Sequence, residues 1–158
     1  MALDALVLDD DTLQRGSEAQ RVDWETNIRA LLDQAVCNLD EPVTLRVTPT
    51  EQQFVLRFEG PKGDEIVTAV VDHALLRDQI ADYVDIVRQI TNADSLNQME
   101  ALDMAKKVTH DRAGRVLKRE LRRVGFDLET SRRLFTLLLS LKVDTTRLPG
   151  VYGHRRVR

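Results

Sequence analysis

Alternating apolar and polar positions predict three strands in the first half of the chain. The alternation runs over Val43–Thr48 and again over Phe54–Glu59, and a period of two residues is typical of a half-buried strand. Ile66–Val71 is apolar on both faces except at Thr68, which predicts a more central strand. The links between these segments are short, and Gly60–Asp64 is the strongest turn signal in the chain. Together the three segments predict an antiparallel meander.

Before the meander, the pattern predicts one strand and one helix. Ala5–Leu8 is a short apolar run that ends at Asp9–Asp11, and we expect an edge strand there. The aspartates lack the alternating spacing and the glycine of a calcium loop, so we interpret them as a strand end kept soluble by charge. From Ser17 onward, apolar spacing predicts an amphipathic helix. Its expected apolar face consists of Val22, Ile28, Leu31, Leu32 and Val36.

After Asp72 the apolar spacing becomes helical and remains so. A first helix is predicted to close around Thr91–Asp94, and Ser95 is a good N-cap for the next. That second helix is predicted to run to about Val124, with Gly125 as a left-handed C-cap.

Asp127 caps a last predicted helix, Leu128–Leu141. Lys142–Arg158 contains one proline and two glycines and is expected to be an exposed, basic C-terminal tail. The predicted fold class is α+β: an N-terminal strand and helix, a three-stranded antiparallel meander, then three helices packed on the sheet. Residues 1–141 would form a single globular domain.

Composition restricts the class of protein. A chain of 158 residues with 42% hydrophobic residues fits one domain with a sizeable core. The single cysteine cannot form an internal disulfide. The opening residues lack the pattern of a signal peptide, and the apolar stretch 134–141 is far too short to span a bilayer. We expect a cytoplasmic protein with no membrane contact.

Charge is divided unevenly along the chain. Residues 1–104 hold 8 Lys and Arg against 21 Asp and Glu, whereas residues 105–158 hold 15 against 5. Such a division bears on partners and association kinetics, although not on fold. It is the main functional feature of the sequence.

A basic stripe on the predicted helices carries the leading hypothesis. It consists of Arg112, Arg115, Arg119, Arg122 and Arg123, and the next predicted helix adds the binding candidates Arg132 and Arg133. We predict a non-catalytic protein-interaction or regulatory module that docks through this stripe and the tail, with a protein partner or a second copy as ligand. The alternative is a nucleic-acid-binding regulator whose arginines contact phosphates. The acidic total, a net charge of −3, makes the protein partner the favoured one.

His110 supports a third hypothesis, a small enzyme. On a helix, Glu100, Asp103 and His110 fall on one broad face, with Val108 on the opposite one. Asp103 or Glu100 could orient the imidazole as an acid–base group. No nucleophile or oxyanion hole is indicated nearby, and the competing interpretation is a solvated face with i,i+4 ion pairs.

The sequence indicates no metal or cofactor site. The three histidines are widely separated, and no phosphate-binding glycine loop occurs. Cys37 is expected to be a small hydrophobic residue that is buried or partly buried. We therefore predict neither a metal nor a cofactor.

Two blocks of the helical half carry a family resemblance. One is Met99–Met104 followed by Lys106, Lys107 and His110, and the other is Phe126–Leu137. Both resemble Uncharacterised Protein Family 0262, a bacterial family found mainly in alphaproteobacteria. The resemblance covers about the first 141 residues. It implies a single cytoplasmic domain, and it implies no activity, cofactor or catalytic residue.

Overall fold

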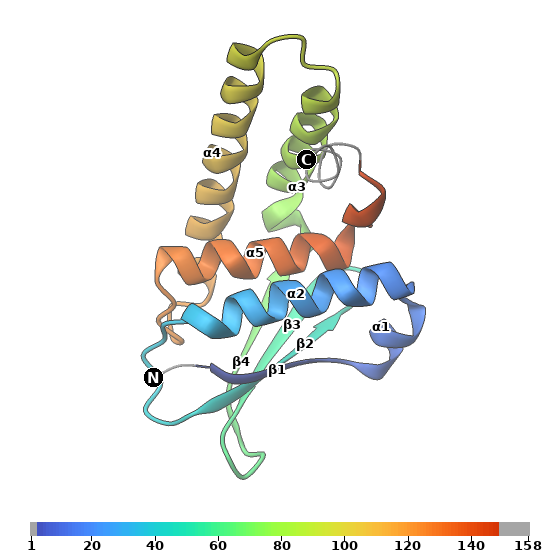
Figure 1. The fold of residues 1–158 in the computed structure, drawn as a ribbon. Helices are drawn as coiled ribbons and strands as arrows, with labels where there is room; N and C mark the ends of the chain where they lie inside the picture. Colours follow the sequence, from blue (N-terminus) through green and yellow to red (C-terminus); the bar gives the residue numbers. More distant parts are fainter. Residues whose placement is uncertain (1–2, 149–158) are drawn as a thin grey trace.

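The structure, a computed structural model, describes residues 3–148 and confirms the α+β class (Figure 1). Its elements in chain order are β1 (Leu3–Leu8), α1 (Asp10–Arg15), α2 (Glu18–Gln34), β2 (Val43–Pro49), β3 (Gln53–Glu59), β4 (Glu65–Asp72), α3 (His73–Thr91), α4 (Leu96–Glu120), α5 (Leu128–Lys142) and a short 3₁₀ helix, Thr145–Arg147.

One sheet holds all four strands in the order β1-β2-β3-β4. The meander β2–β3–β4 is antiparallel, as predicted, and β1 joins it as a fourth strand parallel to β2. The prediction that Ile66–Val71 is central is wrong, since β4 is an edge strand. Its second apolar row lies on the face of the sheet without helices, where Val70 is 45% exposed.

The core lies between the sheet and the pair α2 and α5, which cross over one of its faces (Figure 1). Leu45 and Leu56 of the sheet and Leu31 of α2 are fully buried there. The predicted apolar face of α2 is partly wrong. Val22 is 60% exposed and Val36 lies beyond the helix, while Trp24 is buried instead.

The aspartate run forms a helix start that the pattern did not predict. Asp9 is the N-cap of α1, and its carboxylate accepts from the amide of Thr12. Asp10 and Asp11 occupy the first turn, where acidic side chains interact favourably with the helix dipole. The run therefore has a structural role at the end of β1.

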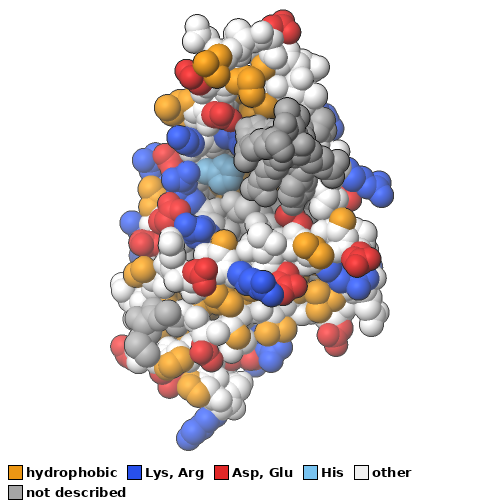
Figure 2. All heavy atoms as spheres, viewed as in Figure 1, with side chains coloured by type: hydrophobic (Ala, Val, Ile, Leu, Met, Phe, Trp, Pro, Cys, Tyr) orange, Lys and Arg blue, Asp and Glu red, His pale blue; other side chains and the backbone are white. Residues whose placement is uncertain are grey.

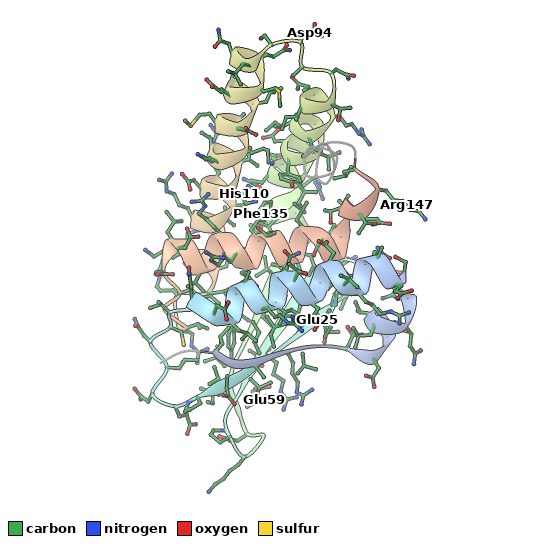
Figure 3. All side chains as sticks on the ribbon, viewed as in Figure 1. Glu25, Glu59, Asp94, His110, Phe135 and Arg147 are labelled. Carbon is green, nitrogen blue, oxygen red and sulfur yellow. The ribbon has the colours of Figure 1, made fainter. Side chains whose placement is uncertain are left out.

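The hairpin α3–α4 stands away from the sheet (Figure 1). Ser95 caps α4 as predicted, since its hydroxyl accepts from the amide of Gln98. The prediction that all three late helices pack on the sheet is wrong for most of this hairpin. α3 and α4 pack mainly on each other, and α4 packs on α5. Asp94, between the two helices, marks the tip in Figure 3.

The link from α4 to α5 confirms one predicted cap and corrects the other. α4 ends at Glu120, one turn before the predicted end, and its C-cap is Leu121 rather than Gly125. Gly125 does have the predicted left-handed conformation, with a φ of 74°. Asp127 caps α5, accepting from the amide of Thr130 at 2.8 Å. Hydrogen bonds from the hydroxyl and amide of Thr130 hold the pKa of Asp127 below its usual value.

The chain remains folded beyond Leu141. Lys142 is the last residue of α5, and Val143 and Leu148 pack against the core. The rest of the expected tail, residues 149–158, lies outside the described residues. Within residues 3–148, no helix is long and apolar enough to cross a membrane.

Candidate functional site

The predicted basic stripe lies on the lower half of α4 and the turn that follows it. Arg112, Arg115 and Arg119 are spaced three and four residues apart on α4, and Arg122 and Arg123 come in the turn. All five side chains are exposed. In Figure 2, Lys and Arg side chains gather over the lower half of α4, with a few Asp and Glu side chains among them. The structure therefore brings these five arginines together.

The opposite face of α4 explains why the stripe faces solvent. Thr109, Ala113, Gly114 and Leu117 are buried, and they are the residues through which α4 packs against the rest of the fold. A Cβ on Gly114 would lie 2.9 Å from Cγ of Arg132, so the glycine permits a close approach of α4 and α5. Sequence reasoning did not single out Gly114, and an isolated glycine inside a helical pattern was the available signal.

Arg132 and Arg133, the two predicted arginines of α5, are engaged within the chain. Nε of Arg132 lies 3.2 Å from a carboxylate oxygen of Asp111, as an ion pair without an aligned hydrogen bond. Arg133 donates to Oε1 of Gln34 at 2.9 Å, and Glu129 lies within 3.5 Å of both guanidinium groups. These two arginines are thus separated from the exposed set.

The remaining arginines are less compensated. Arg119 lies 3.7 Å from its neighbour Glu120. Across the described part of the chain, no ion pair within 4.0 Å involves the other four predicted arginines of this region. We refer to these four as the arginine patch: Arg112, Arg115, Arg122 and Arg123.

The comparisons with known proteins bear on the whole fold. The sequence model of one family, Uncharacterised protein family (UPF0262), matches residues 2–144, which is nearly the whole described chain. The chain belongs to UPF0262. The resemblance seen in the helical half is thereby confirmed and extends slightly beyond residue 141.

The chain is similar to UPF0262 proteins from several bacteria, mostly alphaproteobacteria. It is 31% identical to one from Hyphomonas neptunium over 113 residues, which covers 69% of this chain and 70% of that protein. It is 29% identical to one from Xanthobacter autotrophicus over 150 residues, covering 88% and 90%. One from Phenylobacterium zucineum is 30% identical over 149 residues, covering 88% and 91%. No solved structure matches the chain.

His110 of this UPF0262 chain lies where α4 crosses α5, beside Phe135 (Figure 3). Its ring is edge-on to Phe135 at 5.3 Å and to Tyr83 of α3 at 5.5 Å. Nδ1 lies 2.9 Å from the carbonyl oxygen of Lys106. A carbonyl can only accept, so Nδ1 carries the hydrogen, and Nε2 is the acceptor of the neutral ring.

The surroundings of His110 favour the neutral imidazole. Burial lowers its pKa most. The hydrogen bond with the Lys106 carbonyl has the next-largest effect and raises the pKa, whereas the charges of Arg132 and Lys106 lower it and that of Asp111 raises it. The group that fixes its tautomer is thus a backbone carbonyl rather than a carboxylate.

Asp103 and Glu100, the predicted orienting carboxylates, are both exposed on α4. Val108, expected on the packed face of the helix, is 42% exposed, whereas His110 is half-buried. The face of α4 that packs on the rest of the fold therefore differs from the predicted one. It includes Thr109, which is buried, and His110, whose ring contacts Tyr83 of α3 and Phe135 of α5. The geometry therefore assembles an aromatic contact around His110 and no acid–base pair with either carboxylate.

A groove of about 460 Å³ between α3 and α4 adjoins the arginine patch. Asp82 and Asp85 of α3 line one side, Met104 and Val108 of α4 form apolar walls, and Arg112 also lines it. Sequence reasoning missed this groove. The available signal was the spacing of Met104, Val108 and Arg112 at four-residue intervals, which places them on one helix face.

Cys37 and His73 both lie in the buried part of the fold. Cys37 is buried, as predicted. His73 is buried, with Nε2 2.7 Å from the carbonyl oxygen of Thr50 and its ring edge-on to Phe54 at 4.5 Å. Among residues 3–148, no group of three or more His, Cys, Asp or Glu side chains is placed to hold a metal ion.

Proposed function

We propose that this UPF0262 chain is a non-catalytic interaction module that docks an acidic protein surface through the arginine patch. The supporting observation is that Arg112, Arg115, Arg122 and Arg123 are exposed and close in sequence, without carboxylate partners in the described chain. Uncompensated charges of one sign steer a complementary partner and fix its orientation. The overall charge of −3 supports a protein partner over a nucleic acid, since nucleic-acid-binding domains are commonly basic as a whole.

The division of the predicted arginines also supports a protein partner. The nucleic-acid hypothesis used Arg132 and Arg133, and both guanidinium groups already contact Glu129. The exposed arginines that remain form a compact patch at one end of α4. Such a patch fits a local contact with a protein better than a long row of contacts with nucleic-acid phosphates.

The test is affinity capture from the native bacterium with two variants of equal charge. The patch variant carries alanine at Arg112, Arg115, Arg122 and Arg123, and the control carries alanine at four exposed arginines elsewhere, Arg15, Arg29, Arg77 and Arg88. Alanine suits the positions that lie on helices, and Arg122 and Arg123 are exposed in the turn after α4, so both variants are expected to fold.

We expect the wild type and the control to capture the same protein after nuclease treatment, and the patch variant to lose it. Equal capture by the patch variant, or no captured protein with the wild type, would contradict the proposal. Loss of all capture on nuclease treatment would assign the patch to nucleic acid instead.

A further inference from the structure

One exposed face of α4 changes character halfway along the helix. Ala101, Met104, Val108, Arg112, Arg115 and Arg119 follow one another at intervals of three or four residues. At about 100° per residue, this spacing places them on a single face, away from buried Ala113 and Leu117. Met104 is 58% exposed and Val108 42% exposed. The first half of this face is therefore apolar and the second half cationic.

The apolar half is flanked by acidic side chains. Asp82 and Asp85 of α3 line the groove together with Met104 and Val108, and Arg112 also lines it. The acidic groove thus lies beside the upper part of α4, and the arginines continue from it toward the lower end. A surface with opposite charges on its two halves is complementary to itself after a half-turn.

We propose that the occupant of this groove is a second copy of the chain, packed antiparallel along α4 about a two-fold axis at Val108. This inference rests on the proposed function, because it names the partner of the arginine patch. Val108 is the middle residue of α4 (Leu96–Glu120), so antiparallel pairing about it overlaps the whole helix.

The pairing follows from the symmetry. Val108 contacts Val108 of the other copy, and Met104 packs on the aliphatic stem of its Arg112. Arg115 of the other copy lies over Ala101, where Asp85 lines the groove. Each copy thus contributes two acidic side chains, Asp82 and Asp85, and two basic ones, Arg112 and Arg115. Because the interface is isologous, every contact between the copies occurs twice. The exposed Met104 and Val108 side chains become buried.

Charge reversal with rescue tests the pairing. Sedimentation velocity of the wild type should give twice the chain mass of 18.0 kDa, with dissociation promoted by salt. Arg115→Glu and Asp85→Arg should each raise the dimer dissociation constant at least about tenfold, because each places like charges face to face. The double variant should return to a value near that of the wild type, which a merely structural effect would not give. A monomeric wild type, or single variants that dimerise normally, would overturn the proposal.

A cysteine probe tests the axis itself. Val108→Cys should form a disulfide-linked dimer on mild oxidation, since only residues near a two-fold axis meet their own copy. The matched control is Val22→Cys on α2, which is also an exposed valine and should stay monomeric under the same oxidation. Native Cys37 is buried. No disulfide at Val108, or equal linkage at Val22, would contradict the axis.

The two proposals fail separately. If the wild type is a monomer but still captures another protein through the arginine patch, the self-pairing is overturned and the docking function stands. If the wild type dimerises as described, the patch variant of the capture experiment should also be monomeric. A patch variant that remains a dimer would overturn the pairing.

Discussion

Nε of Arg132 lies 3.2 Å from a carboxylate oxygen of Asp111, joining α5 to α4 across the helix contact. This pair removes Arg132 from the basic surface and leaves the patch on α4 as the uncompensated part. Both side chains are about one-third exposed, at 31% and 38%, so solvent weakens their attraction.

Asp111→Asn should therefore lower the free energy of unfolding by only about 0–1 kcal/mol. Urea titration of Asp111→Asn, Arg132→Gln and the double variant measures the coupling between the two residues. A coupling above about 2 kcal/mol would show that the pair is a main support of the helix contact, contrary to this interpretation.

Gly114 should tolerate no large side chain. An added Cβ would lie 2.9 Å from Cγ of Arg132 and 3.1 Å from Cδ1 of Leu128. Gly114→Leu should cost about 1–3 kcal/mol of stability through overpacking. Ala19→Leu on the exposed side of α2 is the matched control and should change stability by less than about 0.5 kcal/mol. Equal effects of the two substitutions in thermal unfolding would mean that α4 and α5 are not closely packed at Gly114.

Trp24 should stabilise the end of α5. Its Nε1 donates to the carbonyl oxygen of Ser140 at 3.0 Å in a buried contact, and Ser140 lies in the last turn of α5, whose carbonyls have no partners within the helix. Trp24→Phe should cost about 1–3 kcal/mol, because it leaves this carbonyl unsatisfied. Circular dichroism in urea measures the loss. Thr26→Ala, at an exposed position of α2, should have a much smaller effect, and equal losses would contradict the role of the hydrogen bond.

His110 should make stability depend on pH near neutrality. Its folded pKa is lowered from 6.5, chiefly by burial, so the unfolded chain binds the proton first as the pH falls. The free energy of unfolding should therefore decrease as the pH falls through 6.5, until the folded pKa is reached. His110→Gln removes this titration, and its stability should vary less between pH 7.5 and 5.5. Parallel pH profiles for the two proteins would contradict the burial of the imidazole.

The strands could be predicted because each has one face in the core. Alternation over Val43–Thr48 reports the burial of every second residue, and the turn signal at Gly60–Asp64 marks the link between β3 and β4. The apolar residues on both faces of β4 led to the wrong prediction that this strand is central. Val70 is apolar but lies on the face of the sheet that no helix covers, where it is exposed.

Helix faces were harder to predict from spacing. On α2, Val22 fits an apolar stripe, but the larger indole of Trp24 determines which side is buried. Two other helices, α3 and α5, pack against α4, and its buried residues include Thr109 and Gly114, whose types give little hydrophobic signal. A single helical period cannot describe a helix with two packing partners.

The sequence predicted which arginines belong to the basic region, but not which of them are engaged by other side chains of the chain. The spacing from Arg112 to Arg119 placed those arginines on one exposed face, as the structure has them. Arg133 is bound by Gln34 of α2, and Arg132 pairs with Asp111 of α4. Both partners lie on other helices and are distant in sequence. Such contacts depend on how the helices pack against one another, and residue spacing along the sequence does not reveal this.

Site-specific photo-crosslinking from the arginine patch tests the central claim most directly. A benzoylphenylalanine in place of Lys118, which lies among the patch residues and is exposed, should crosslink to a discrete protein partner in living cells, a second copy included. The same probe in place of Asp33, exposed on α2, should not. Equal crosslinking from both positions, or none from Lys118, would contradict a docking role for the basic end of α4.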